Sequence, residues 1–295
     1  MKQVLKVIKG ITAHPLASKN KLRCILRFFK WQVGQRILPY PIIYTLVEQS
    51  KLVVSKGMHG ATGNVYVGLL EFNEMGFVLH ALRENDLFGD IGANIGVYSI
   101  LASVNCGADS IAVEPVPGTY SNLVRNVKLN SAEEKIKALQ LGIGDVETVL
   151  KFTNHLDTIN GVAKNQDTDE NTVSVFVKRL DDIFADRKPV ILKIDVEGYE
   201  WNVLQGGKTV FQDTTLKAVI IEINGSGKAY GISDDEIHDF LLSHNFLPYT
   251  YEPFDRVLTQ LDTYGDTNTI YIRDIEWVAG RLRSSKKFDV IGVSI

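Results

Sequence analysis

Residues 86–98 combine an acidic side chain with spaced glycines, a pattern that could bind a ligand. A short apolar run ends at Asp90, and Gly92 and Gly96 then bracket Asn94 before apolar residues recur at helical intervals. Glycine permits a positive φ and lets a ligand approach the backbone, while the start of a helix presents unpaired N–H groups and a partial positive charge. The stretch therefore predicts a strand, a tight turn and a helix that bind a nucleotide-like ligand.

The spacing of these glycines distinguishes two kinds of nucleotide ligand. Dinucleotide-binding turns follow the pattern Gly-x-Gly-x-x-Gly and hold a pyrophosphate at the start of the helix. The pattern here is Asp-x-Gly-x-Asn-x-Gly, which lacks the middle glycine and places Asp90 before the turn. A carboxylate there would repel a pyrophosphate and attract a cationic amino group. The turn thus favours a cationic ligand, and a glycine-rich turn without any ligand is the alternative.

Further acidic residues follow the next two predicted strands. Glu114 ends a buried run and lies 24 residues after Asp90, close to the spacing at which an acid reaches ribose hydroxyls in doubly wound folds. Asp145 follows a predicted strand at 136–143 and could accept a hydrogen bond from the exocyclic amine of adenine. An exposed strand-end acid for Glu114 and a turn-forming Asp for Asp145 are the alternative interpretations.

A second concentration of charge lies at residues 190–200. An apolar run there contains Lys193 and passes directly into Asp195, Glu197 and Glu200 at the start of a helical pattern. Charged groups commonly line strand ends without chemistry, so a salt-bridge cluster on the surface is the alternative to a functional site.

The elements around these motifs alternate regularly. Strand and helix patterns alternate five times from residue 86, which predicts a doubly wound, mostly parallel α/β sheet with helices on both faces. Segments 246–251 and 269–272 are the candidate closing strands, and strands at 52–54 and 65–67 are expected to form a hairpin beside the sheet. In such sheets ligands bind beyond the carboxyl ends of the strands, where the strand order reverses.

Two other segments bear on the site. The polar stretch 154–172 is longer than most structureless connections and is a candidate lid, with His155 as its histidine. Glu71 and Glu74, on a predicted helix before the first motif, are expected to be solvated or capping charges.

Composition is that of an ordinary globular protein. The 295 residues are 45% apolar and 23% charged, which suits one large α/β domain with an appendage. Cys24 and Cys106 lie far apart and give no disulfide framework, which favours a reducing compartment such as the cytoplasm. Neither a membrane-spanning run nor an export signal is expected.

Charge is distributed unevenly along the chain. The net charge is −3, yet the first 47 residues contain nine Lys or Arg and no acid. Residues 18–35 predict a basic amphipathic helix whose apolar face consists of Leu22, Ile25, Leu26, Phe29 and Val33. Such a helix could lie on the anionic inner face of a membrane, or pack on the domain with its basic face in solvent. The acidic remainder of the chain argues against a nucleic-acid partner.

Together the motifs resemble the FkbM family of S-adenosylmethionine-dependent methyltransferases. The resemblance rests on Asp90-Ile-Gly-Ala-Asn-Ile-Gly, Glu114-Pro115, Gly144-Asp145, Leu180-Asp181 and, most specifically, Lys193-Ile-Asp-Val-Glu-Gly-Tyr-Glu200. It implies a Rossmann-like class I methyltransferase sheet of seven strands over residues 51–275, after a basic helical and β-hairpin extension over 1–50 and before a tail over 276–295. It also implies O-methylation of a small-molecule or glycan hydroxyl, often on a sugar or secondary metabolite.

The resemblance further implies roles for single residues. The methionine and ribose part of S-adenosylmethionine would be lined by Asp90, Gly92, Asn94 and Gly96, with Tyr98 also on the cofactor side. Glu114 would hold the ribose and Asp145 the adenine edge. In the strand order of these enzymes, 3-2-1-4-5, Asp90 and Asp195 lie side by side. Asp195 and Glu197 would face the acceptor, and one of them would remove or orient its hydroxyl proton.

A metal-assisted reaction is the less favoured variant. Asp195, Glu222 and Asn224 end the fourth and fifth strands, and their oxygens could hold Mg²⁺, which would lower the pKa of the acceptor. Metal-dependent catechol-type methyltransferases carry a lysine one turn after the acid of the fourth strand, whereas Glu197 and Gly198 follow here. A noncatalytic nucleotide-binding or membrane-associated module and a nicotinamide-dependent oxidoreductase are the alternative functions.

Overall fold

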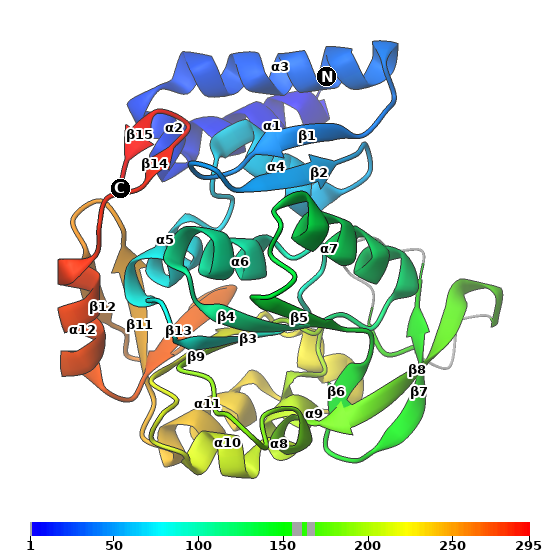
Figure 1. Cartoon of the computed structure of the whole chain (residues 1–295), viewed down its shortest axis with the longest axis vertical. Coiled ribbons are helices and arrows are strands. Elements are labelled where there is room, and N and C mark those ends of the chain that lie inside the picture. The colour runs from blue at the N-terminus through cyan, green and yellow to red at the C-terminus, as the bar shows by residue number, and fades with distance from the viewer. Residues whose placement is uncertain (1, 155–160, 164–168) are drawn as a thin grey trace.

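The computed structural model describes residues 2–154, 161–163 and 169–295 (Figure 1). Its centre is one eight-stranded sheet between two layers of helices. From one edge to the other, the strands are β5 (Ile136–Leu139), β4 (Asp109–Val113), β3 (Leu87–Ile91), β9 (Ile191–Ile194), β10 (Ala218–Glu222), β13 (Asn268–Ile272), β11 (Leu247–Glu252) and β12 (Val257–Gln260). The strands from β5 to β10 are parallel, and each of the last three is antiparallel to its neighbours.

This topology confirms the predicted doubly wound, mostly parallel sheet, and 246–251 and 269–272 contribute its closing strands β11 and β13. All residues of β3 and β9 are buried, because helices cover both faces of these apolar strands. Seven strands were expected and eight are present. The additional strand is β12, which forms an antiparallel hairpin with β11 at the edge of the sheet.

Helices cover the two faces of the sheet (Figure 1). One face carries α5 (Phe72–Ala81), α6 (Val97–Ile100) with a π-helical continuation over Leu101–Asn105, α7 (Pro117–Leu129) and α12 (Ile275–Ser284). The other carries α8 (Leu180–Ile183), α9 (Glu200–Gln205), α10 (Lys208–Gln212) and α11 (Asp234–Ser243). Successive strand residues alternate between the two hydrophobic cores, as Leu87 and Phe88 do.

The N-terminal extension packs on the α5 side of the sheet (Figure 1). Its elements are α1 (Lys2–Ala13), α2 (Pro15–Lys19), α3 (Lys21–Ile37), the hairpin of β1 (Ile42–Thr45) with β2 (Lys51–Val54), and α4 (His59–Val67). Leu16, Trp31 and Leu46 belong to the hydrophobic core on that side. Residues after α12 return to the same core, where Phe288 is buried before the short hairpin of β14 (Asp289–Val290) and β15 (Val293–Ser294).

Two local predictions are wrong. Residues 65–67 belong to helix α4 rather than to a strand. The helix is favoured because Ala61 and Val65 pack into the core. At its end, the Asn64 side chain accepts a hydrogen bond from Leu70 N at 2.8 Å. The predicted single strand at 136–143 is divided between β5 and β6.

A second, three-stranded sheet accounts for that division. It contains β6 (Gly142–Gly144), β8 (Thr172–Arg179) and β7 (Thr148–Thr153), in that spatial order. Short 3₁₀ helices span Asp169–Asn171 and Ser226–Tyr230. Of the predicted lid at 154–172, residues 155–160 with His155 and 164–168 lie outside the described residues. In the part of the chain that the structure describes, no helix is long and apolar enough to cross a bilayer.

Helix α3 packs through a different face from the one predicted. Cys24, Phe28 and Trp31 are buried, whereas Leu22 and Phe29 of the predicted apolar face are exposed.

Candidate functional site

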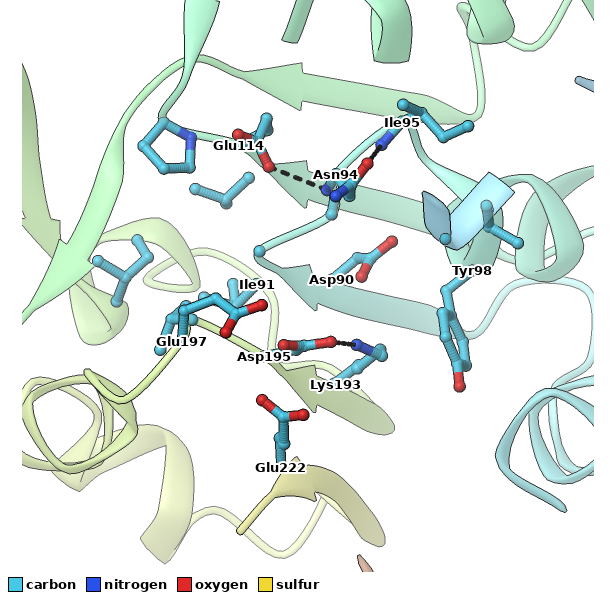
Figure 2. Close-up of a pocket in the computed structure, with 18 of the residues that line it drawn as sticks. Asp90, Ile91, Asn94, Ile95, Tyr98, Glu114, Lys193, Asp195, Glu197 and Glu222 are labelled. Carbon is cyan, nitrogen blue, oxygen red and sulfur yellow. Dashed lines mark hydrogen bonds and ion pairs between the residues drawn. The ribbon is translucent and has the colours of Figure 1, made fainter. Parts of the chain in front are cut away.

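A cavity of about 280 Å³ lies at the carboxyl ends of β3, β4, β9 and β10 (Figure 2). Its lining includes the acids Glu71, Asp90, Glu114, Asp195, Glu197 and Glu222. Among the described residues of the lining, Lys193 is the only Lys or Arg. The lining therefore contains more acidic than basic side chains, which favours a cationic ligand.

The glycine-rich turn after β3 leaves no room for side chains at two of its glycines. Gly92 has φ +80°, and a Cβ built on it would lie 1.8 Å from the backbone oxygen of Asp195. Gly96 has φ +87°, and its Cβ would lie 2.4 Å from Leu123 Cδ1. Asn94 has φ +50°, a left-handed conformation that Asn tolerates better than most residues. The turn can therefore pass close to the end of β9.

Glu114, at the end of β4, is held by backbone donors on both of its carboxylate oxygens. Asn94 N donates to Oε2 at 2.9 Å, and Val116 N donates to Oε1 at 3.0 Å. Burial raises the pKa of Glu114 to about 7, against the lowering effect of these two hydrogen bonds. Each carboxylate oxygen keeps a second acceptor position that a ligand hydroxyl could use.

Asp90 is buried at the floor of the site and is oriented by the helix that follows the turn. Ser99 donates to Asp90 Oδ2 from its backbone N at 3.1 Å and from its hydroxyl at 2.6 Å. Burial raises the pKa of Asp90, and the nearby charge of Lys193 opposes that rise. In the sheet, Asp90 is the direct neighbour of Lys193, which brings the two sequence motifs together.

Lys193 links several groups of the site. Its Nζ donates to Asp195 Oδ2 at 2.7 Å and lies 4.8 Å from the centroid of the Tyr98 ring. Burial alone would lower the pKa of Lys193, but the charges of Asp195, Glu71 and Asp90 raise it above its usual range. The lysine is therefore charged and already paired.

The loop after β9 owes its shape to Glu200. One Glu200 oxygen accepts hydrogen bonds from Val196 N and Gly198 N, both at 3.1 Å. Gly198 has φ +101°, and a Cβ on it would lie 2.8 Å from the backbone oxygen of Ser226. Glu197, between these donors, takes a left-handed conformation with φ +55° and lines the cavity. Glu200 thus positions Glu197 from beneath.

Asp195, Glu197 and Glu222 form a cluster of three carboxylates (Figure 2). One oxygen from each lies within 4.8 Å of the others. Burial, followed by repulsion from Asp195, raises the pKa of Glu197 to about 7 and that of Glu222 to about 8. Glu222 Oε2 is buried and has no hydrogen-bond partner among the described residues. The cluster can hold a proton at neutral pH, and its oxygens are also suitable for a hard divalent cation.

The structure brings together most of the residues that the sequence predicted. Of the predicted site residues, the cavity lining includes Asp90, Gly92, Asn94, Tyr98, Glu114, Asp195 and Glu197. Gly96 supports the turn from outside the lining. Asp145 is exposed, lies outside the lining, and accepts a hydrogen bond from Asn202 Nδ2 at 3.3 Å. Asn224, predicted as a metal ligand, is also exposed, and its side-chain oxygen accepts a hydrogen bond from Ser226 N. The third residue of the carboxylate cluster with Asp195 and Glu222 is Glu197 instead.

Glu71 belongs to the site, although the sequence predicts a solvated or capping charge at this position. It lines the cavity and accepts a hydrogen bond from Tyr98 Oη at 2.5 Å. Glu74, beside it, is mostly buried, and this burial raises its pKa to about 7. The signal that could have identified Glu71 is weak, because a single acid before a helix more often caps that helix.

Comparison with known proteins places these motifs in a family. The family model of the methyltransferase FkbM domain matches residues 90–248. Hexuronic acid methyltransferase AglP of Haloferax volcanii is 28% identical over 148 residues, which cover 50% of this chain and 59% of that protein. Methyltransferase sdnD of Sordaria araneosa is 32% identical over 159 residues, which cover 42% of this chain and 61% of that protein. The chain thus matches about three fifths of the length of these relatives.

Among solved structures, this chain is similar to precorrin-6y C5,15-methyltransferase of Geobacter metallireducens GS-15, with a TM-score of 0.42 and 12% sequence identity. The superposed region covers 78% of this chain and 98% of that protein.

Proposed function

Because the chain belongs to the FkbM methyltransferase family, we propose that it transfers the methyl group of S-adenosylmethionine to a hydroxyl of a sugar, glycolipid, polysaccharide or secondary metabolite. The observation that carries this proposal is the charge of the cavity, because the described residues of its lining include six acids and one lysine. Such a cavity favours a positively charged nucleoside over the pyrophosphate of a dinucleotide. A nicotinamide-dependent oxidoreductase is therefore disfavoured.

The residues around the glycine-rich turn suit this cofactor. When bound, S-adenosylmethionine supplies a methyl group that its positively charged sulfur has already activated. Glu114 would accept hydrogen bonds from the two ribose hydroxyls, using the second acceptor position on each oxygen. Asp90 and Asn94 would line the methionine part, and the carboxylate of Asp90 would attract its amino group.

Glu197 is the better candidate for the general base. Asp195 is fixed in an ion pair with Lys193, which suits it to orient an acceptor hydroxyl. Glu197 has a pKa raised to about 7, a value that suits a base working near neutral pH. Proton removal by a positioned base typically contributes 10²- to 10⁴-fold to a rate, and alignment of the reactants contributes up to roughly 7 to 11 kcal/mol.

We infer that the same cluster disfavours acceptors that carry a negative charge. If Asp195 orients the acceptor, a carboxylate on that acceptor would lie near Asp195, Glu197 and Glu222, and Lys193 is already paired. Repulsion of this kind is an effective means of rejecting a ligand. A neutral hydroxyl compound therefore suits this chain better than hexuronic acid, the compound named for AglP.

Two measurements test the proposed function. Isothermal titration calorimetry would compare S-adenosylmethionine, its demethylated product and NAD. Mass spectrometry would then follow transfer of a labelled methyl group to neutral glycans, hexuronic acids, glycolipids and small metabolites. We expect both sulfur nucleosides to bind, and a neutral hydroxyl compound to be methylated.

The outcomes separate the alternatives. Binding of NAD without binding of the sulfur nucleosides would contradict the methyltransferase proposal. Nucleoside binding with no transfer to any acceptor would favour a noncatalytic module. Preferential methylation of hexuronic acids would contradict only the argument from acceptor charge. Normal turnover by Asp195→Asn would exclude Asp195 from orienting the acceptor.

A further inference from the structure

Helix α3 presents a second apolar face to solvent. This outer face consists of Leu22, Leu26, Phe29, Val33 and Ile37, whose exposed fractions range from 46% to 71%. At about 100° per residue, the five side chains lie within about 80° of arc on a stripe about 22 Å long. The opposite side of α3 is the one that packs on the domain, through Cys24, Phe28 and Trp31. Among the described residues, nothing covers this outer face.

Basic side chains flank this outer face. Counting around the helix places exposed Lys30 and Arg23 within about 40° of one edge of the stripe and exposed Arg36 within about 20° of the other. The first acid of the chain is Glu48, well beyond the helix. An apolar centre with cationic flanks and no acids is the pattern of a helix that lies in the interface of an anionic bilayer.

The positive charge beside the outer face of α3 indicates a negatively charged partner. We propose that the outer face of α3 binds the surface of an anionic lipid bilayer, with the helix parallel to the membrane plane. A nucleic acid would match the lysines but would leave the apolar stripe in water. A second copy of the chain, paired through the same face, would bring its own lysines and arginines against these and would be repelled.

The proposed membrane face lies one helix away from the cavity. Helix α4 packs beneath α3, where Tyr66 contacts Phe28 edge-to-face at 5.2 Å between ring centroids and accepts a hydrogen bond from Gln32 Nε2 at 3.1 Å. On the same helix, Ala61 and Asn64 line the cavity. Binding through α3 would therefore hold one wall of the cavity close to the lipid surface.

Vesicle sedimentation of the full chain tests this proposal. The probes are vesicles of phosphatidylcholine and vesicles of phosphatidylcholine mixed with phosphatidylglycerol. We expect sedimentation mainly with the anionic vesicles, and weaker sedimentation at high salt. The Leu26→Asp/Phe29→Asp variant should lose at least about tenfold in partitioning for each side chain. The Lys30→Gln/Arg36→Gln variant should lose about fivefold per residue on anionic vesicles.

A matched control is available elsewhere on the surface. Val146 and Val149 are similarly exposed, at 55% and 59%, and lie far along the chain, in the bend before β7 and on β7 of the small sheet. The Val146→Asp/Val149→Asp variant makes the same change of charge and should sediment like the unchanged protein. Thermal unfolding followed by circular dichroism would verify that each variant is folded, and the Lys30→Gln/Arg36→Gln variant leaves every apolar side chain of the outer face in place.

Three results would overturn the proposal. The first is a lack of sedimentation with anionic vesicles. The second is equal sedimentation of the folded Leu26→Asp/Phe29→Asp variant and the unchanged protein. The third is a lipid-independent dimer that this variant abolishes, which would show that the outer face binds a second copy instead.

Discussion

Asn94 donates its backbone N–H to Glu114 Oε2 at 2.9 Å, so the acid that follows β4 holds the turn that follows β3. The second oxygen of Glu114 is held in the same way by Val116 N at 3.0 Å. Because both donors belong to the backbone, the orientation of the carboxylate depends on the fold rather than on a flexible side chain.

We expect Glu114→Gln to weaken the binding of S-adenosylmethionine. An amide offers only one acceptor atom, so at least one ribose hydroxyl would lose its partner. Hydrogen bonds to charged groups contribute about 1.5 to 3 kcal/mol, which corresponds to roughly 10- to 100-fold in Kd. Calorimetry would measure the change, with Glu133→Gln, at an exposed acid, as the matched control. An unchanged Kd would exclude Glu114 from the ribose site.

Gly92 should tolerate no side chain. The Cβ of Gly92→Ala would lie 1.8 Å from the backbone oxygen of Asp195, at a φ of +80°. We expect a loss of more than about 2 kcal/mol in the free energy of unfolding, since a clash adds to the strain of left-handed backbone. Gly280→Ala, with no atom within 4 Å of the new Cβ, is the control and should be neutral or stabilising. Denaturant unfolding of both variants would show whether the difference exists.

The close approach of Gly92 to Asp195 also shows what the sequence could predict. Each motif joins an apolar run, an acid and a glycine, and the strand order of a doubly wound sheet requires the two runs to be neighbours. The pairing of Asp90 with Lys193 therefore follows from local pattern and topology together. The cavity at the carboxyl ends of these strands was predictable for the same reason.

Other parts of the site depend on packing that no local pattern records. Glu71 lines the cavity and accepts a hydrogen bond from Tyr98, which lies on another helix. Asp145 lies outside the cavity lining and directly after β6, which pairs with β8 in the small sheet instead of continuing the predicted strand. In residues 65–67, the packing of Val65 overrides the strand preference of β-branched side chains. In each case the structure differs from the prediction because tertiary contacts, which the local sequence pattern does not record, determine where the residue lies.

The pH dependence of turnover should identify the base. Burial and the charge of Asp195 raise the pKa of Glu197 to about 7, and a base must be unprotonated to act. We therefore expect kcat to fall as the pH decreases through about 7. Glu197→Gln should lower kcat by 10²- to 10⁴-fold while leaving the Kd of S-adenosylmethionine unchanged. If Glu222→Gln instead removes the pH dependence, Glu222 is the base.

Chelation distinguishes a metal-assisted reaction from one that uses the carboxylates alone. We expect activity to persist in excess EDTA, because Lys193 already neutralises Asp195 and a protonated Glu222 would relieve the remaining repulsion. Steady-state rates with and without the chelator would test this. Loss of activity that added Mg²⁺ restores would show that Asp195, Glu197 and Glu222 hold a metal ion instead.

His80 should make the stability of the fold depend on pH. It is fully buried, with Nδ1 2.7 Å from Tyr251 Oη, and burial followed by repulsion from Arg256 and Arg83 lowers its pKa from 6.5 to about 3. Between these values the unfolded chain binds a proton that the folded chain does not, so stability is present above pH 6.5 and decreases as the pH falls toward 3. The contribution of His80 to this slope is up to about 1.4 kcal/mol per pH unit. Denaturant unfolding between pH 4 and 7 should show a shallower slope for His80→Gln, and equal slopes would mean that other groups determine the acid sensitivity.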